Sequence, residues 1–294
     1  MTYNNEDRTF KPPKKTNLPF FAYGIFKPGQ LAYSKIESLV DEISPAKINY
    51  LMKLRDGVPI LIDHEKESFQ TKGFIITFND NEKAYNIISN TLSKKLYKWK
   101  KIKIGKKEVN ILFAVNPYKG SNNIEDKDER YDFNGKNDPF FKEAISLVEK
   151  NLKSIEPSWN MEDFFKVQMN YMLLWSAIDR YSSLKYNQNS KNMNNKKFAE
   201  EKAFKKCIRK YKKDKHIPVY SAEDLKMYEF KVNDPVKTLK YYYTIRCNVV
   251  HRGKSMLGDF KMLKQATEEL LEIFKEILND TFNKSNNMIF IKND

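Results

Sequence analysis

The stretch YYYTIRCNVVHRGKS, residues 241–255, brings together three side-chain types that can cleave a phosphodiester bond. The imidazole of His251 can move protons to or from a 2′-hydroxyl or a leaving oxygen near neutral pH. The guanidinium of Arg246 can hold a phosphate through two hydrogen bonds and stabilise the additional negative charge of a transition state. The amide of Asn248 can orient either group. This chemistry requires no metal and no cofactor.

The spacing of these residues limits how they can meet. A five-residue step along a helix turns about 140°, so Arg246 and His251 are not stacked on one helical face. They can converge where the helix loosens at Gly253, or across a symmetric interface between two copies of the chain. Asn248 precedes His251 by three residues, so the two are surface neighbours on a helix. A helix end with solvated polar residues remains the alternative.

Composition favours a basic, folded, cytoplasmic protein. The 294 residues have a net charge of +15, and 40% are hydrophobic. Such a charge favours polyanionic partners, with nucleic acid first and an anionic membrane second, although lysine-rich faces are often only solvated. Two cysteines are too few for a disulfide framework or a zinc site. We expect no signal peptide and no membrane span, because long apolar runs are absent.

We expect an α+β fold of two domains. Residues 1–17 are polar and predict a flexible lead-in to a first, small, mixed and barrel-like domain over 18–118. Short β-rich runs separated by polar turns predict its strands, at 18–26, 58–63, 72–78, 98–104 and 109–115. Helices are predicted at 34–43 and 81–92.

Residues 119–137 are polar and predict a linker to a second, all-α domain over 138–294, in which the apolar period changes to 3.6. Ser158 and Asp234 are placed as N-caps of two of its helices. A polar loop is expected at 185–196. Helices are predicted at 140–155, 159–184, 197–213, 235–253 and 257–282.

The helical region resembles the HEPN superfamily over about residues 138–282. RCNVVHRGK (246–254) resembles its Arg-x4-6-His signature, and LLWSAIDRY (173–181) resembles the aromatic helix beneath it. The resemblance implies a helical, usually dimeric, metal-independent ribonuclease whose site draws on both protomers. Many members act in toxin–antitoxin or antiviral systems.

Carried over by position, the resemblance makes Arg246 and His251 the catalytic pair and Asn248 an auxiliary polar group. Asp179 would hold an arginine in place. Arg252 and Lys254 are expected to bind RNA phosphates. The family often has a polar residue directly after the arginine, whereas this chain has Cys247, which we expect to be a small buried residue.

The first domain resembles the γ-glutamylcyclotransferase-like fold over roughly residues 18–118. FAYGIFKPGQ (21–30) resembles its glycine loop, and DGVPIL (56–61), KGFIITF (72–78) and LYKWKKIKI (96–104) resemble further conserved runs of that fold. The resemblance implies a ligand loop at Tyr23, Gly24, Ile25 and Phe26, in which Gly24 lets backbone N–H groups approach a carboxylate.

The enzymes of that family use a glutamate as acid and base, but residues 86–97, NIISNTLSKKLY, contain no carboxylate. We therefore expect a non-catalytic domain that binds a small molecule, a partner protein or RNA. Residues 94–107 have eight lysines and no acid before Glu108. Tyr97, Trp99 and Lys100 in this run suit stacking on single-stranded bases, and a lysine-protected edge strand is the alternative.

The sequence thus predicts a homodimeric endoribonuclease that produces 2′,3′-cyclic phosphate ends, with a sensing or recruiting N-terminal domain. One alternative is a non-enzymatic, dimerising adaptor that only binds RNA or a partner. The other is a small-molecule enzyme of the γ-glutamyl class.

Overall fold

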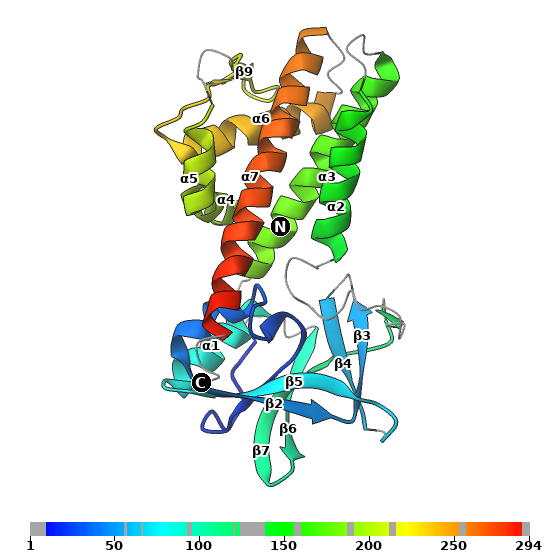
Figure 1. Cartoon of the computed structure of the whole chain (residues 1–294), viewed down its shortest axis with the longest axis vertical. Coiled ribbons are helices and arrows are strands. Elements are labelled where there is room, and N and C mark those ends of the chain that lie inside the picture. Colours follow the sequence, from blue (N-terminus) through cyan, green and yellow to red (C-terminus); the bar gives the residue numbers. More distant parts are fainter. Residues whose placement is uncertain are drawn as a thin grey trace. The chain divides into compact units, whose positions relative to one another are not determined.

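The computed structural model describes residues 10–55, 58–65, 67–92, 96–119, 121–123, 139–155, 160–186, 191–211, 216–252 and 257–289 (Figure 1). Within these ranges, the side chains of 121–123, 139, 191–194, 251–252, 257–258 and 283–289 are not described. The chain divides into two compact units. The first comprises residues 1–139 with 285–294, and the second comprises residues 140–284.

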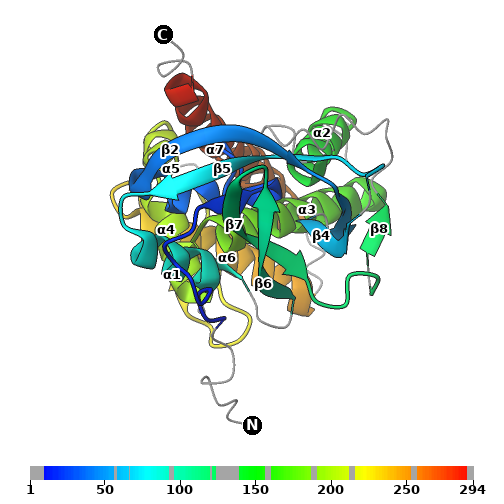
Figure 2. The same ribbon diagram turned by 90° about the horizontal axis from the view of Figure 1, so that it is seen from below.

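The first unit is built on a five-stranded sheet in the order β2-β5-β1-β7-β6. The central strand β1 pairs antiparallel with β5 and parallel with β7. Figure 2 shows β2 and β5 running side by side, with β7 and β6 as neighbouring strands. The strands are β1 (Phe20–Ala22), β2 (Val40–Ile48), β5 (Thr71–Phe78), β6 (Tyr97–Ile104) and β7 (Lys107–Ala114).

A second, three-stranded sheet in the order β4-β3-β8 completes this unit together with one helix. Its strands are β3 (Tyr50–Arg55), β4 (Val58–Glu65) and β8 (Ser121–Asn123), and the helix is α1 (Asn81–Thr91). The side chain of Asp80 caps α1 by accepting from the backbone N–H of Lys83 at 3.0 Å.

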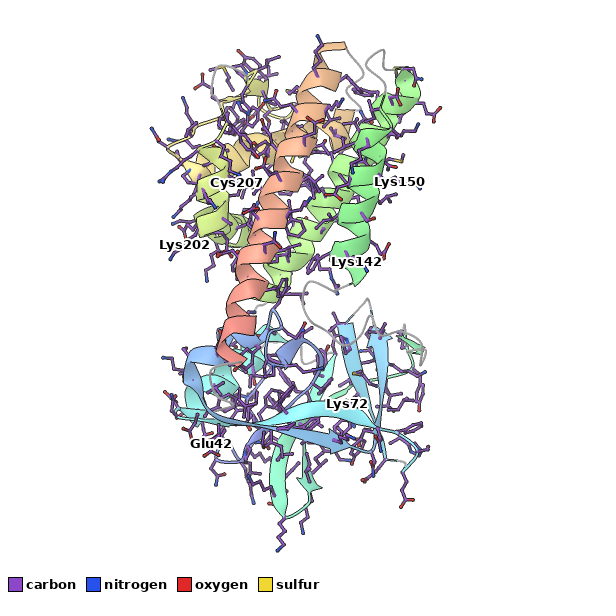
Figure 3. The ribbon with its side chains drawn as sticks, in the orientation of Figure 1. Glu42, Lys72, Lys142, Lys150, Lys202 and Cys207 are labelled. Atoms are coloured by element: carbon purple, nitrogen blue, oxygen red, sulfur yellow. The ribbon has the colours of Figure 1, made fainter. Side chains whose placement is uncertain are left out.

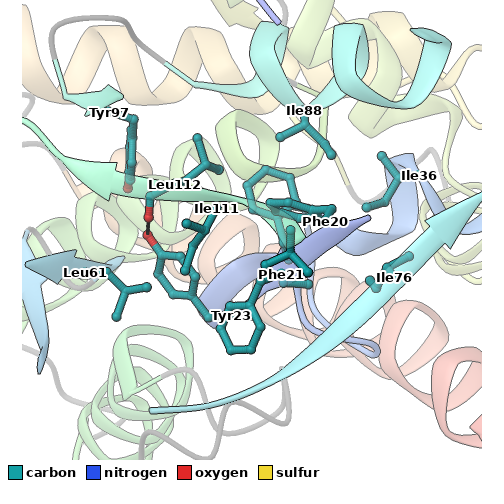
Figure 4. Packing of buried hydrophobic residues seen from close by; sticks show 14 of the residues in the cluster. Phe20, Phe21, Tyr23, Ile36, Leu61, Ile76, Ile88, Tyr97, Ile111 and Leu112 are labelled. Carbon is teal, nitrogen blue, oxygen red and sulfur yellow. Dashed lines mark hydrogen bonds between the residues drawn. The ribbon is translucent and has the colours of Figure 1, made fainter. Parts of the chain in front are cut away.

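The core of the first unit is rich in aromatic side chains (Figure 4). Phe20 meets Tyr85 and Trp99 edge to face at ring-centroid distances of 6.4 and 5.9 Å. The hydroxyl of Tyr23 donates to the carbonyl of Leu112 at 2.9 Å, so its polar atom is satisfied inside the core. Each such ring contributes about 1.5–3 kcal/mol by leaving water.

The expected helix at 34–43 is wrong. Two short 3-10 turns, Tyr33–Lys35 and Glu37–Leu39, lead directly into β2. The physical reason is pairing with a strand far along the chain, since residues of β2 pair with β5 from Val40↔Phe78 to Ile48↔Thr71. Pro45 is tolerated because β2 is an edge strand. The strand expected at 18–26 shortens to β1 and a 3-10 turn at Gly24–Phe26.

The second unit consists mainly of helices, so the expectation of strands in the N-terminal region and helices in the C-terminal region is confirmed. The helices are α2 (Pro139–Lys153), α3 (Met161–Tyr186), α4 (Lys191–Glu200), α5 (Lys202–Ile208), α6 (Pro235–Arg252) and α7 (Leu257–Ile289). An all-α region is not correct in detail, because β9 (Val219–Tyr220) pairs with β10 (Met227–Tyr228).

Helix boundaries follow capping side chains. Asp234 caps α6 as expected, since its Oδ1 accepts from the backbone N–H of Lys237 at 3.0 Å. Asn160 caps helix α3; Ser158, the expected cap, lies outside the described residues. Asn160 Oδ1 accepts from the N–H of Asp163 at 3.0 Å, and Asp163 accepts from the N–H of Asn160 at 3.3 Å.

The basic region expected as one helix at 197–213 is two helices, α4 and α5, and α4 already begins inside the expected loop at 185–196. The two opposite faces of α5 differ in their exposure to solvent. Phe204 and Cys207 are buried, whereas Lys202 and Lys206 are exposed. Figure 3 places Lys202 and Cys207 on α5, and Lys142 and Lys150 on α2.

Candidate functional site

Helix α6 contains the Arg-x4-His spacing, and Arg246 is held on it by packing. The guanidinium Cζ of Arg246 lies 5.5 Å from the ring centroid of Tyr243, at cation–π distance. Tyr243 in turn meets Trp175 of α3 edge to face at 5.6 Å. Trp175 is fully buried. A rigid aromatic pair therefore fixes the base of the Arg246 side chain.

Among the residues that the structure describes, Arg246 makes no ion pair, and its buried Nε has no hydrogen-bond partner. No described contact joins it to Asp179, whose own interactions lie partly outside the described residues, so the expected role of Asp179 in holding an arginine stays a prediction. The side chain is partly exposed. A positioned guanidinium of this kind is suited to receiving an anion.

His251 and Arg252 are the last two residues of α6. Their side chains, and the whole of Lys254, lie outside the described residues. The structure thus brings positions 246, 248 and 251 onto one helix. Cys247, expected to be buried, is partly exposed, whereas Cys207 is buried.

Asn248 has a different role from the one expected. Its side chain is 1% exposed, and both ends of the amide bind the backbone next to the β9–β10 hairpin. Oδ1 accepts from the N–H of Ala222 at 2.8 Å, and Nδ2 donates to the carbonyl of Tyr220 at 2.8 Å. Asn248 is therefore a positioning residue that attaches the hairpin to α6, and its donor and acceptor face the hairpin and not a substrate.

The hairpin is also attached at its other end. Lys240 Nζ lies 4.9 Å from the ring centroid of Tyr228, and the hydroxyl of Tyr241 donates to the carbonyl of Ile217 at 3.2 Å. Contacts at 240, 241 and 248 show that the hairpin follows two turns of α6, toward the end at which position 251 lies. Sequence patterns did not reveal this hairpin because its strands have only two residues each.

A buried polar cluster that sequence reasoning missed links the segment before the hairpin to α7. The side chain of His216 is 2% exposed. Its Nε2 lies 2.9 and 3.0 Å from the two carboxylate oxygens of Glu269, and its ring stacks on Phe230 at a centroid distance of 3.8 Å. The partner carboxylate lies 53 residues further along the chain, so no local pattern could have indicated it.

Glu269 collects further donors from two helices. The hydroxyl of Tyr242 on α6 donates to Oε2 at 2.6 Å, and Gln265 Nε2 donates to Oε1 at 2.9 Å. Burial and, second, the charge of Glu269 raise the pKa of Tyr242 well above its ordinary value, so the hydroxyl remains a donor. This cluster fixes the rotation of α6 about its own axis one turn before Arg246.

The two aromatic side chains of the basic strand β6 pack toward the core. Tyr97 is 8% exposed, and Trp99 packs against the core, parallel to Phe10 at 5.8 Å and edge to face with Tyr85 at 5.4 Å. Tyr97 is therefore not placed to stack on single-stranded bases, because its ring is buried, whereas Trp99 is partly buried and one face of its ring is covered by Phe10. Lys100 is half exposed and binds Asp63 Oδ1 through Nζ at 2.7 Å.

The expected ligand loop is closed onto the core. Tyr23 and Phe26 are buried, and Ile25 packs against the same cluster. The N–H groups of Phe26 and Lys27 bind the carbonyls of Tyr23 and Gly24 at 3.1 and 3.2 Å, so they are used within the turn. Gly24 has a φ of +53°, and a Cβ there would lie 2.9 Å from Pro59 Cβ. Glycine is required at this position for the turn and its packing.

No protein-family model, no curated protein and no solved structure matches this chain. Within the described ranges, no helix is sufficiently long and apolar to cross a membrane. Over the same ranges, no three His, Cys, Asp or Glu side chains group in a way that could hold a metal ion.

Proposed function

We propose that this protein is a metal-independent endoribonuclease that acts as a homodimer, with Arg246 and His251 as its catalytic pair. The observation that supports it most directly is the partly exposed guanidinium of Arg246, which has no ion pair with any described residue and is held over Tyr243 on the helix that ends at His251–Arg252. The proposed cut is an attack of the 2′-hydroxyl on the adjacent phosphorus, with departure of the 5′-oxygen, which leaves a 2′,3′-cyclic phosphate.

In this proposal the side chains of His251 and Arg246 have different catalytic roles. The imidazole of His251 transfers the proton between the 2′-hydroxyl and the leaving oxygen, and Arg246 stabilises the charge that develops on the phosphate. Arg252 and Lys254 contact neighbouring phosphates. The buried cluster around Glu269 and the amide of Asn248 support the site indirectly, because they hold α6 and the hairpin in place.

Dimerisation is proposed because a five-residue step separates the two groups by about 140° around one helix. A row of exposed apolar side chains on α3 supports binding of a protein partner. Met161, Phe165 and Met169 recur at four-residue intervals and are 47, 54 and 63% exposed. Such an apolar row on an exposed helix face is typical of an interaction surface. Helix α3 contacts α6 through Trp175 and Tyr243.

The test is RNA cleavage by purified protein with EDTA present. The wild type is expected to degrade RNA to fragments with 2′,3′-cyclic phosphate ends. Arg246→Ala and His251→Ala are each expected to lower the rate by about 10²–10³-fold. Lys237→Ala is the matched control, since Lys237 is an exposed cation on the same helix and is expected to leave the rate unchanged.

Mixing the two inactive variants tests whether two copies share the site. If each site takes its arginine from one protomer and its histidine from the other, random re-association restores about a quarter of the wild-type activity. RNA that stays intact with the wild type, while the protein still binds it, would favour the non-enzymatic adaptor.

We further propose a role in a toxin–antitoxin or antiviral system, with the N-terminal unit as a non-catalytic sensing domain. Expression of the wild type is then expected to arrest growth, and the His251→Ala variant is expected to allow it.

A further inference from the structure

The first unit contains a cavity of about 520 Å³ that lies apart from the Tyr23–Phe26 loop. Its size falls within the usual range for small-molecule sites, roughly 300–1,000 Å³. The walls come from the end of β4, the start of β6 and the turn that follows β7. The lining residues are Ile62, Asp63, His64, Lys98, Ala114, Val115, Asn116, Pro117 and Tyr118.

The polar wall of this cavity contains Asp63 and Lys98, and a second lysine, Lys100, is bound to Asp63 beside it. Asp63 receives Lys98 Nζ on Oδ2 and Lys100 Nζ on Oδ1, both at 2.7 Å. Although burial alone would raise the pKa of Asp63, the two lysines lower it overall, so the carboxylate stays ionised. The Lys98–Asp63–Lys100 group as a whole carries one net positive charge, although only Lys98 and Asp63 line the cavity. The next carboxylate on the strand, Glu65, accepts from the hydroxyl of Tyr50 at 3.3 Å.

The floor of the cavity is held in an unusual backbone conformation. Asn116 has a φ of +50°, which a non-glycine residue adopts at a cost of about 1 kcal/mol. Arg55 stabilises this turn, because its Nη2 donates to the carbonyls of Val115 and Asn116 at 3.0 and 2.6 Å. A strained turn that is held by a long-range arginine is a feature of built sites.

The rim carries an exposed aromatic ring. Tyr118 is 67% exposed, although its side chain belongs to the cavity wall. Lys53 Nζ lies 5.0 Å from the ring centroid and adds a further positive charge at this edge. A solvent-facing ring beside a basic wall can stack on a planar group whose other end is anionic.

We propose that this cavity binds a small anion that bears a planar ring, of the class of nucleoside 5′-monophosphates. Lys98 binds the phosphate, with Lys100 kept near by Asp63, and Tyr118 stacks on the base. The apolar wall of Ile62, Val115 and Pro117 covers the sugar. The site is independent of Arg246 and His251, so it does not depend on the proposed ribonuclease activity.

Calorimetric titration of the full chain with adenosine 5′-monophosphate tests this assignment, with inorganic phosphate and adenosine as partial ligands. The Arg246→Ala protein is used throughout, so that binding at the proposed cleavage site does not interfere. We expect the monophosphate to bind at least tenfold more tightly than either partial ligand. Lys98→Gln and Tyr118→Ala are each expected to weaken it tenfold or more.

Lys103→Gln is the control, because Lys103 is an exposed lysine of the same strand that does not line the cavity. It is expected to bind like the parent, and circular dichroism checks that each variant is folded. The assignment is overturned if the parent protein binds no monophosphate up to millimolar concentrations, or if Lys98→Gln leaves the affinity unchanged. Equal affinities for phosphate and the monophosphate, with no effect of Tyr118→Ala, would likewise overturn it.

Discussion

Tyr241 and Tyr242 are adjacent buried tyrosines whose hydroxyls donate to acceptors of different charge. Mutation of each to phenylalanine should therefore lower the stability of the second unit by a different amount. The hydroxyl of Tyr242 donates to the carboxylate of Glu269 at 2.6 Å, whereas that of Tyr241 donates to the neutral carbonyl of Ile217 at 3.2 Å. Hydrogen bonds to charged groups contribute about 1.5–3 kcal/mol, and neutral ones contribute about 0.5–1.5 kcal/mol.

Tyr242→Phe is therefore expected to lower the free energy of opening of α6 and α7 by about 1.5–3 kcal/mol, and Tyr241→Phe by about 0.5–1.5 kcal/mol. Both rings stay in place, since the side chains are 0 and 2% exposed and only the oxygen is removed. Hydrogen exchange measured by mass spectrometry on peptides from the two helices gives these free energies for the second unit alone.

A double-mutant cycle isolates the carboxylate. Glu269→Gln keeps the shape of the side chain and removes its charge, so Tyr242→Phe should cost less in that background, by at least about 1 kcal/mol. The effect of Tyr241→Phe should not change. If Tyr242→Phe costs no more than Tyr241→Phe, or if Glu269→Gln leaves its cost unaltered, the charged cluster does not hold α6 as argued.

Three further predictions concern single residues. Asn248→Ala should lower the free energy of unfolding by about 1–3 kcal/mol, because it leaves backbone groups next to the β9–β10 hairpin without partners. Hydrogen exchange should speed up more in residues 219–228 than in α7. Gly24→Ala should lower the melting temperature more than Gly105→Ala. Both glycines have a positive φ, but of the two only Gly24 would place the added methyl within 3 Å of a neighbour, Pro59 Cβ. Equal shifts in melting temperature would contradict the packing argument. The stability advantage of the wild type over Asp63→Asn should be full at pH 7, because the folded pKa lies below the ordinary 3.8. This stability advantage should shrink as the pH falls through the folded pKa of Asp63. Urea titrations at several pH values measure it, and an advantage that does not change with pH would contradict the Lys98–Asp63–Lys100 arrangement.

Elements whose signals are local could be predicted from the sequence. Helix α1 was expected at 81–92 and spans Asn81–Thr91, and α6 was expected from Asp234–Pro235 and begins there. In both cases a capping aspartate is followed within a few residues by apolar side chains at helical spacing, so the start of the helix can be predicted from the sequence alone. The mixed class, with strands first and helices after, follows from the same change of period.

Other features depend on residues that are distant in the sequence. The segment 34–43 has helical spacing, but pairing of β2 with β5 outweighs this local preference. Trp99 follows a lysine and precedes another, so its sequence surroundings indicate an exposed ring, yet the ring is partly buried against Phe10, Phe20 and Tyr85.

Residue order alone was sufficient for the class of fold, most helix limits and the Arg246–His251 spacing, because each depends on neighbours within a turn or two. The folded chain was needed to show that His216 is buried against Glu269 and that Asn248 holds a hairpin. It was also needed to show that Asp63 and Lys98 form one wall of a cavity. These environments are made by partners 26 to 53 residues away, and burial and pairing exist only once the chain has brought those partners together.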